Sequence, residues 1–401
     1  MARLSTEELN KVKEKYNVSR IWSWSRVNTF MTSPYEYMLK YLKHAPEDRQ
    51  DCAYTTLGSL AHDTIDDLYE CRIKYEDMIS QFEDGWLTAI DIANLKLDRN
   101  DEEHDAKLKS KYKEDLQHFF KNHTVYEYNM MIERPVVAQI GNNIFVGYID
   151  AIYKDNDGNY NIIDFKTSSI YTGKTLEEHL GQLTIYAIGL NQAGVPLDNI
   201  KIGFNFLKYV TIQYEQKNGT VKTRNVERCK IGESLQSNAK MWLKSLGYED
   251  DVNYYLKALL DTNSIVVLPE DVQEKYVITD CHVFTELDLK LVDKWTDTIV
   301  STINDIEMRE KDYEETKSDK CFWDSDESVK KQSYYFSTLS CYSPNLHKPY
   351  KEYLDKLESA KNGSNLFDGV GKDCNCDIMS TSNVICKDNE EIDLSWLDSI
   401  Q

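Results

Sequence analysis

The stretch that decides the fold runs from Gly147-Tyr-Ile-Asp150 to Asp164-Phe-Lys-Thr167. Each half lies in a run of apolar residues, and a polar turn separates the two, which is typical of strands joined in a hairpin. Paired strands of this kind bring Asp150 and Asp164 to the same end of a sheet. Lys166 follows Asp164 by two residues, so on a strand both side chains point to the same face.

These residue types suit one kind of chemistry. Two neighbouring carboxylates, Asp150 and Asp164, form a hard oxygen site that suits Mg²⁺ or Mn²⁺. The ammonium of Lys166 beside them can orient a water molecule, a combination suited to hydrolysis of a phosphodiester. The alternative is a surface salt bridge at a strand end, which a bare Asp-x-Lys pattern usually is. The apolar flanks and the helix expected over 176–192 favour the catalytic interpretation.

The composition bounds the class of protein. The chain has 401 residues, 41% of them hydrophobic and 29% charged, which is ordinary for one enlarged domain or two tightly joined ones. We find no run of about 18 apolar residues that would predict a membrane span, and the polar N-terminus lacks a secretion signal. Nine scattered cysteines favour reduced thiols over a disulfide framework. We expect a cytoplasmic protein, bacterial or in a virus-infected host cell.

The pattern of elements predicts an α/β fold with a central mixed sheet, in the core order αβββαβ, and four segments along the chain. Residues 1–130 form a helical region that contributes to the site, and residues 131–230 form the sheet. Residues 231–360 are mainly helical, with a strand near 276–284. Residues 361–401 carry eight acidic residues against three lysines and no apolar periodicity, which is typical of a flexible acidic tail.

Four blocks of the chain resemble the RecB-like exonuclease group of the PD-(D/E)xK nuclease superfamily. Together they span about residues 23–209, near half of the chain, and their order and spacing are more specific than any single block. The blocks are Ser23-Trp-Ser-Arg26 with Ser33-Pro-Tyr-Glu-Tyr37, Leu57-Gly-Ser-Leu-Ala-His62, Gly147–Asp150 with Asp164–Thr167, and Gln182-Leu-Thr-Ile-Tyr186. The resemblance implies a restriction-endonuclease-like core with helical additions at both ends.

The resemblance also implies roles for single residues. Asp150 and Asp164 would bind the divalent metal, with the carbonyl of Phe165 completing its shell. Lys166 would position the attacking water. His62 would be a further metal ligand, contributed by a helix packed against the sheet, although a lone helical histidine is more often structural.

A second group of residues would support the site or contact DNA. Gln182 and Tyr186 stand at i and i+4 and therefore share one helical face. Arg26, from the first block, receives the same supporting or DNA-binding role. Glu133 precedes the first core strand and would line the site, the alternative being a solvated loop glutamate.

The cysteines depart from a pattern found in part of this group. Some RecB-like nucleases hold a [4Fe–4S] cluster through four cysteines, the first of them in a "CP" motif. Ser33 occupies that position here, and Cys321, Cys341, Cys374 and Cys386 are not spaced as the compact C-terminal group requires. We therefore expect unligated thiols.

Contact with DNA requires local positive charge on a chain whose formal net charge is −21. The hairpin region 208–230 carries six basic residues against two acidic ones, with Lys208, Lys222 and Arg224 interleaved with tyrosines. A basic hairpin with aromatic residues beside the metal site would follow a phosphate backbone and stack bases. The alternative is a solvated strand face.

The function expected is metal-dependent cleavage of DNA that is single-stranded or has a duplex end. Exonucleolytic cleavage in replication, recombination or DNA turnover is favoured. Two alternatives remain open: a nuclease fold that binds DNA or a partner without cutting, and a structure-specific endonuclease. Acidic and apolar residues over 390–400 could dock onto a protein partner, or the terminus could be disordered.

Overall fold

The computed structural model describes residues 4–349 together with residues 352 and 359. The tail predicted over 361–401 lies outside the described residues, as do its docking segment 390–400 and the cysteines Cys374, Cys376 and Cys386. None of the helices in the described part is long and apolar enough to cross a membrane.

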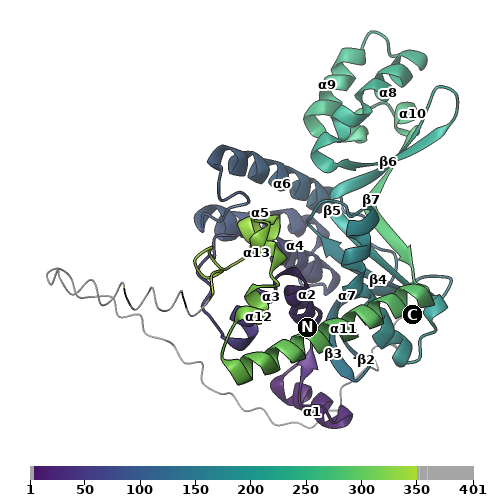
Figure 1. Ribbon diagram of the computed structural model, residues 1–401. Helices are drawn as coiled ribbons and strands as arrows, with labels where there is room; N and C mark the ends of the chain where they lie inside the picture. Colours follow the sequence, from purple (N-terminus) through teal and green to yellow (C-terminus); the bar gives the residue numbers. More distant parts are fainter. Residues whose placement is uncertain (1–3, 350–351, 353–358, 360–401) are drawn as a thin grey trace.

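A mixed sheet forms the centre of the molecule (Figure 1). Within the described residues its strands are β1 (Ile21–Trp22), β2 (Met131–Ile140), β3 (Asn143–Lys154), β4 (Tyr160–Lys166), β5 (Ile200–Glu215), β6 (Val221–Glu227) and β7 (Tyr276–Glu286). The order is β1-β3-β4-β5-β6, with β2 also paired to β3 and β7 also paired to β5. The pairs β1–β3 and β4–β5 are parallel, and the others are antiparallel.

Helices precede, interrupt and follow these strands. They are α1 (Thr6–Tyr16), α2 (Trp24–Thr32), α3 (Pro34–Tyr37), α4 (Ala53–Tyr69), α5 (Met78–Trp86), α6 (Glu102–Asn122), α7 (Gly173–Gln192), α8 (Ile231–Ser245), α9 (Val252–Thr262), α10 (Glu270–Gln273), α11 (Leu289–Thr316), α12 (Lys320–Trp323) and α13 (Glu327–Lys330). From α4 to β5 the α-helices and strands follow in the order α4, α5, α6, β2, β3, β4, α7, β5. The expected α/β architecture, a central mixed sheet flanked by helices, is confirmed.

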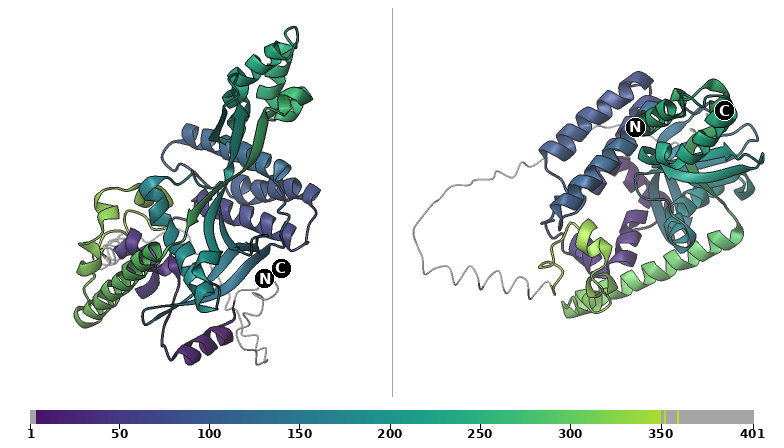
Figure 2. Two further views of the ribbon diagram at one scale, coloured as in Figure 1. Left: turned by 90° about the vertical axis from the view of Figure 1, so that its right-hand side faces the viewer. Right: turned by 90° about the horizontal axis from the view of Figure 1, so that it is seen from above.

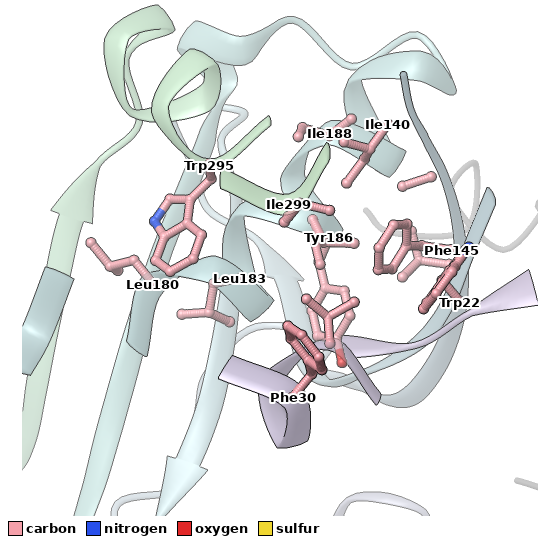
Figure 3. Packing of buried hydrophobic residues seen from close by; sticks show 14 of the residues in the cluster. Trp22, Phe30, Ile140, Phe145, Leu180, Leu183, Tyr186, Ile188, Trp295 and Ile299 are labelled. Atoms are coloured by element: carbon pink, nitrogen blue, oxygen red, sulfur yellow. The ribbon is translucent and has the colours of Figure 1, made fainter. Parts of the chain in front are cut away.

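Two hydrophobic cores cover the two faces of the sheet. Strand residues alternate between faces, so Ile162 and Ile163, neighbours on β4, belong to different cores. The first core packs α2, α3, α7, α11 and α12 against one face, and Figure 3 shows part of it around Tyr186 and Trp295. The second core packs α4, α5 and α6 against the other face. Burial of these apolar side chains on both faces holds the strands in register.

A third core lies in an arm that projects from the main body (Figures 1 and 2). The far half of β5 continues into this arm after an irregularity in its pairing with β7 between Asn205 and Val210. There β5, β6 and β7 pack against α8, α9 and α10. The arm therefore has apolar packing of its own, and long strands connect it to the main sheet.

Two features of the sheet depend on strands outside residues 131–230. β1 and β7 join the sheet although they lie outside residues 131–230, the segment to which the sequence assigned it. β5 is one continuous strand of 16 residues, because β7 pairs along both of its halves. Only the tertiary fold supplies that partner.

Candidate active site

The three acidic residues of the site lie in one row across three strands. The register pairs Ala151 of β3 with Ile132 of β2 on one side and with Ile163 of β4 on the other. One position further along, where the regular pairing is interrupted, Glu133 and Asp164 flank Asp150, and the charges of both act on its carboxyl group. Residues that face one another across paired strands have neighbouring side chains, so acidic charge is concentrated at this point of the sheet.

The backbone changes direction at this row. Strict alternation would place Ile132 and Val136 of β2 on one face, yet Ile132 lies in the second core and Val136 in the first. Ile149 and Ala151 of β3 are divided between the cores in the same way. Glu133 has a φ of 50°, a left-handed conformation that is uncommon for a residue other than glycine. Such conformations cluster at functional sites.

Glu133 therefore corrects the sequence analysis, which placed it before the first core strand. It lies within β2, in the row of Asp150.

Helix α4 brings His62 to the site from the second core. Its Nε2 lies 2.9 Å from the carbonyl oxygen of Phe165, and its Nδ1 lies 3.6 Å from Oδ2 of Asp150. The same carboxylate oxygen of Asp150 accepts a hydrogen bond of 3.3 Å from the N–H of Phe165. One imidazole thus contacts both a strand carbonyl and a carboxylate.

Lys166 and Asp164 are paired directly on β4. The ammonium of Lys166 forms an ion pair with Oδ2 of Asp164, as expected for two residues on the same face of a strand. Asp164 is buried, whereas the Lys166 side chain is a quarter exposed. Lys166 therefore pairs with the buried carboxylate of Asp164 while part of its side chain stays accessible at the surface of the site.

The electrostatics of the site follow from burial and from crowding of charge. Burial and the nearby charge of Asp164 raise the pKa of Asp150 to about 7. Burial opposes the charged form of His62, but the carboxylates of Asp150 and Asp164 outweigh it and raise the pKa of the imidazole. Burial likewise disfavours the ammonium of Lys166, and the same carboxylates raise its pKa above the ordinary value. Lys166 therefore keeps its proton at neutral pH.

Asp66 is a further acidic residue of this region that the sequence analysis missed. Burial raises its pKa to about 7, with the charge of Glu133 as the next cause. Asp66 lies four residues after His62 on α4, so both share one helical face. The four-residue spacing from His62 was the signal in the sequence that could have identified Asp66.

Tyr186 and Gln182 of α7 lie beneath the catalytic strand from the first core. The amide of Gln182 donates a hydrogen bond of 2.9 Å to the hydroxyl of Tyr186. The ring of Tyr186 packs on Gly147 so closely that a Cβ there would lie 2.5 Å from its Cε1. Gly147 therefore lets α7 approach β3 near Asp150. The two helical residues do share one face and lie near the site, as the i,i+4 spacing indicated.

A cleft of about 610 Å³ lies beside Lys166. It is lined by α2, α7, α11 and the segment Tyr335–Leu339, and the lining includes Gln182, Trp24 and Trp295. The candidate lysine thus faces a space large enough for part of a substrate.

Arg26 is held within the first core. Its Nε donates a hydrogen bond of 3.1 Å to the hydroxyl of Tyr37, and a terminal nitrogen lies 3.6 Å from Glu310. It also stacks over the rings of Trp22 and Tyr41. These contacts tie α2 to α3 and α11, so the structure assigns Arg26 a packing role.

The basic hairpin does not lie beside the catalytic row, contrary to the expectation from sequence. Lys222 and Arg224 are on β6 in the arm (Figure 1). Lys222 is exposed, whereas Arg224 stacks over Tyr214 and donates to the carbonyl of Ser234. Lys208 is only 4% exposed and lies 3.5 Å from the ring centre of Tyr112, so it is not available to a phosphate backbone. Its burial lowers its pKa to about 8.

The donor atoms at the site fit a divalent cation. Two carboxylates, one buried and one half-buried, and a carbonyl oxygen are ligands of the expected hard type, and the imidazole adds a nitrogen donor. A cation would offset the burial and the repulsion from Asp164 that raise the pKa of Asp150. In the part of the chain that the structure describes, no three His, Cys, Asp or Glu side chains are grouped closely enough to hold a metal by themselves. The side chains of His62, Asp150 and Asp164 therefore do not by themselves form a closed metal shell in this structure.

Comparison with known proteins identifies the family. A family model of the PD-(D/E)XK nuclease superfamily matches residues 21–323, about three quarters of the chain. The chain belongs to this superfamily. Membership implies a hydrolytic nuclease, of a superfamily whose members typically use divalent metal ions.

Other comparisons add little. No curated protein matches the chain. A solved structure titled "Crystal structure of SSO0001" is similar at 14% identity and a TM-score of 0.17, over 48% of this chain and 75% of that one. The match is too weak to describe the fold here.

Ser33, which occupies the position of the first cluster cysteine, has a partner of its own. Its hydroxyl donates a hydrogen bond of 2.5 Å to Oδ2 of Asp326, and it caps α3 by accepting from the N–H of Glu36. The residue is thus part of the packing between α3 and α13.

Proposed function

We propose that this chain is a RecB-like, divalent-metal-dependent deoxyribonuclease that hydrolyses phosphodiester bonds, acting as an exonuclease in DNA replication, recombination or turnover. The observation that supports it is the meeting of Asp150, Asp164 and Lys166 with His62 and the Phe165 carbonyl beside an open cleft. Ion-pair networks of purely structural residues seldom combine buried acids, a lysine and an open cleft in this way.

The charge state of Lys166 defines its role. Because its pKa is raised above the ordinary value, the ammonium remains protonated and acts as a donor. As an ammonium it would orient the attacking water or neutralise a phosphate oxygen. Asp150 and Asp164, with the Phe165 carbonyl and His62, would hold Mg²⁺ or Mn²⁺. When bound, such a cation supplies the positive charge that phosphodiester hydrolysis requires.

DNA as the substrate is supported by the family resemblance, and the charge distribution limits where DNA could bind. A chain of net charge −21 repels a polyanion over most of its surface. The lysine at the cleft and the exposed lysines of the hairpin are where approach is least opposed. The preference for DNA ends follows from the resemblance to RecB-like exonucleases.

A digestion series on end-labelled DNA tests the proposal. We expect linear DNA to be degraded with Mg²⁺ or Mn²⁺ and to remain intact in EDTA. Asp164→Ala and Lys166→Ala should abolish cleavage while circular dichroism shows the fold unchanged. Retained cleavage by both purified variants would refute the catalytic assignment.

Circular single-stranded DNA separates the alternatives in the same series. An obligate exonuclease leaves circles uncut, whereas a structure-specific endonuclease opens them. Metal-dependent binding without cleavage of any substrate would instead indicate a binding module on a nuclease fold.

A further inference from the structure

We propose that the cleft beside Lys166 contains a subsite for an unpaired nucleobase, formed by Trp24 and Trp295, so that the strand enters the site single-stranded. This inference rests on the proposed nuclease function and specifies its substrate. Both indoles line the same cleft as Lys166. A base seated there would bring the adjoining phosphate toward Lys166, the member of the candidate site that lines the cleft.

The two tryptophans form an ordered pair. Their ring centres lie 5.6 Å apart with an angle of 79° between the planes, the edge-to-face arrangement that aromatic rings prefer. Trp24 is half-buried, on α2, and Trp295 is buried, on α11. Figure 3 shows Trp295 beside Leu180 and Leu183 of α7. Apolar packing therefore holds one ring, and the other borders the open space.

Gly181 on α7 makes room for this pair. A Cβ at this position would lie 2.3 Å from Cη2 of Trp24 and 2.8 Å from Cζ3 of Trp295. Any other residue would push the rings from their places. Glycine is unfavourable within a helix, so its presence in the middle of α7 is explained by the close approach of the two indoles.

Trp295 also carries a hydrogen-bond donor without a partner. Its side chain belongs to a residue that is 6% exposed, and its Nε1–H is buried and bonds to no atom of the described residues. Buried donors are nearly always satisfied, and the indole N–H can only donate. A carbonyl or ring nitrogen of a base would supply the missing acceptor, and because the nitrogen is closed to solvent in this structure, the indole would turn toward the cleft as the base enters.

The size and chemistry of the cleft favour a base over duplex DNA. Its volume of about 610 Å³ suits a ligand of nucleotide size. The rest of the lining mixes apolar side chains such as Met31 with polar ones, including the amides of Asn28 and Gln182 and the carboxylate of Glu178. The face of a base within a duplex is covered by its stacked neighbours, so only an unpaired base can stack on an indole.

Binding to normal and abasic DNA tests the subsite. Fluorescence anisotropy in EDTA, where cleavage is prevented, compares a short labelled oligothymidine with an oligonucleotide of the same backbone that lacks bases. We expect the wild type to bind the oligothymidine about tenfold more tightly or better. Trp24→Leu should bring this ratio close to one, and Trp24→Phe should largely retain it. Trp295→Phe keeps a ring but removes the donor, and should lower the ratio several-fold.

Trp323→Leu is the matched control, because Trp323 also packs against the first core but does not line the cleft. It should leave the ratio unchanged. A wild type that binds both oligonucleotides equally, or Trp24→Leu and Trp295→Phe variants that discriminate like the wild type, would overturn the subsite. Metal-dependent cleavage by the wild type is scored separately, so loss of the subsite and loss of the nuclease function remain distinguishable. If Trp24→Leu does not fold, the Trp295→Phe result decides.

Discussion

Gly147 and Tyr186 set how closely α7 approaches the catalytic strand. We predict that Gly147→Ala lowers the free energy of unfolding by about 1–3 kcal/mol, because the new methyl group overlaps the Tyr186 ring. Urea denaturation measures the change. Gly58→Ala on α4 is the control, since nothing lies within 4 Å of its added Cβ, and it should be neutral or stabilising. Equal losses in both variants would contradict the packing argument.

His62 is the one candidate ligand that comes from a helix. We predict that His62→Ala raises the Mg²⁺ concentration needed for half-maximal cleavage by roughly 10- to 100-fold, because the imidazole lies between Asp150 and the Phe165 carbonyl. Metal titrations of the cleavage rate measure this shift. His104→Ala, at an exposed histidine on α6, should leave the titration unchanged. An unchanged titration for His62→Ala would reduce His62 to a structural residue.

Among the elements, a buried ion pair fixes β7 where the arm meets the main body. Asp280 of β7 accepts a hydrogen bond of 2.6 Å from Arg228, and its other oxygen lies 3.0 Å from Nδ1 of His123. Arg228 also donates to the carbonyl of Leu207 on β5. Burial opposes ionisation, but His123 and Arg228 outweigh it and hold the pKa of Asp280 well below its ordinary value.

This pair predicts both a mutational and an acid sensitivity. Asp280→Asn leaves the Arg228 charge buried without its partner and should cost about 3–5 kcal/mol of unfolding free energy at pH 7. Because the folded pKa of Asp280 is depressed, its contribution is complete well above its ordinary pKa of about 4 and is lost as the pH falls below that value. Urea denaturation at pH 7 and at pH values below about 4 should therefore show the variant deficit shrinking at the lower pH. A deficit independent of pH would contradict the ionic origin.

For the whole molecule, the arm separates basic surface from the catalytic row. We predict that Lys217→Ala with Lys222→Ala weakens DNA binding and lowers the slope of log K against log salt by about 2, one for each lost phosphate contact. The pair Lys11→Ala and Lys15→Ala, on α1, is the matched control (Figure 1). Measuring the DNA affinity of both double variants and of the wild type from low to moderate salt gives the slopes to be compared. An unchanged slope in the hairpin variant would leave the arm without a role in DNA binding.

Much of the catalytic row could be predicted because its signals are local. The alternation that marks β3 and β4, the turn between them and the two-residue step from Asp164 to Lys166 all act within some 20 residues. They locate two acids and a lysine at one sheet position without knowledge of the remaining fold. The i,i+4 spacing of Gln182 and Tyr186 is local in the same sense.

Other assignments could not be made in this way. The place of Glu133 in the row depends on a left-handed residue inside β2, which no local pattern announces. Asp66 belongs to the acidic region only because α4 packs against the sheet. Lys208 looked like a surface cation, yet α6 covers it with Tyr112. Each of these depends on contacts between residues far apart in the chain.

The sequence by itself determined the α/β class and the strand pair that carries Asp150 and Asp164, because strand periodicity and turn residues act over short distances. Only the tertiary structure decided that the sheet divides two cores, that the basic hairpin belongs to a projecting arm, and that two tryptophans from α2 and α11 meet over Gly181. Those outcomes depend on which apolar surfaces are buried together, and that is settled by the packing of the whole chain.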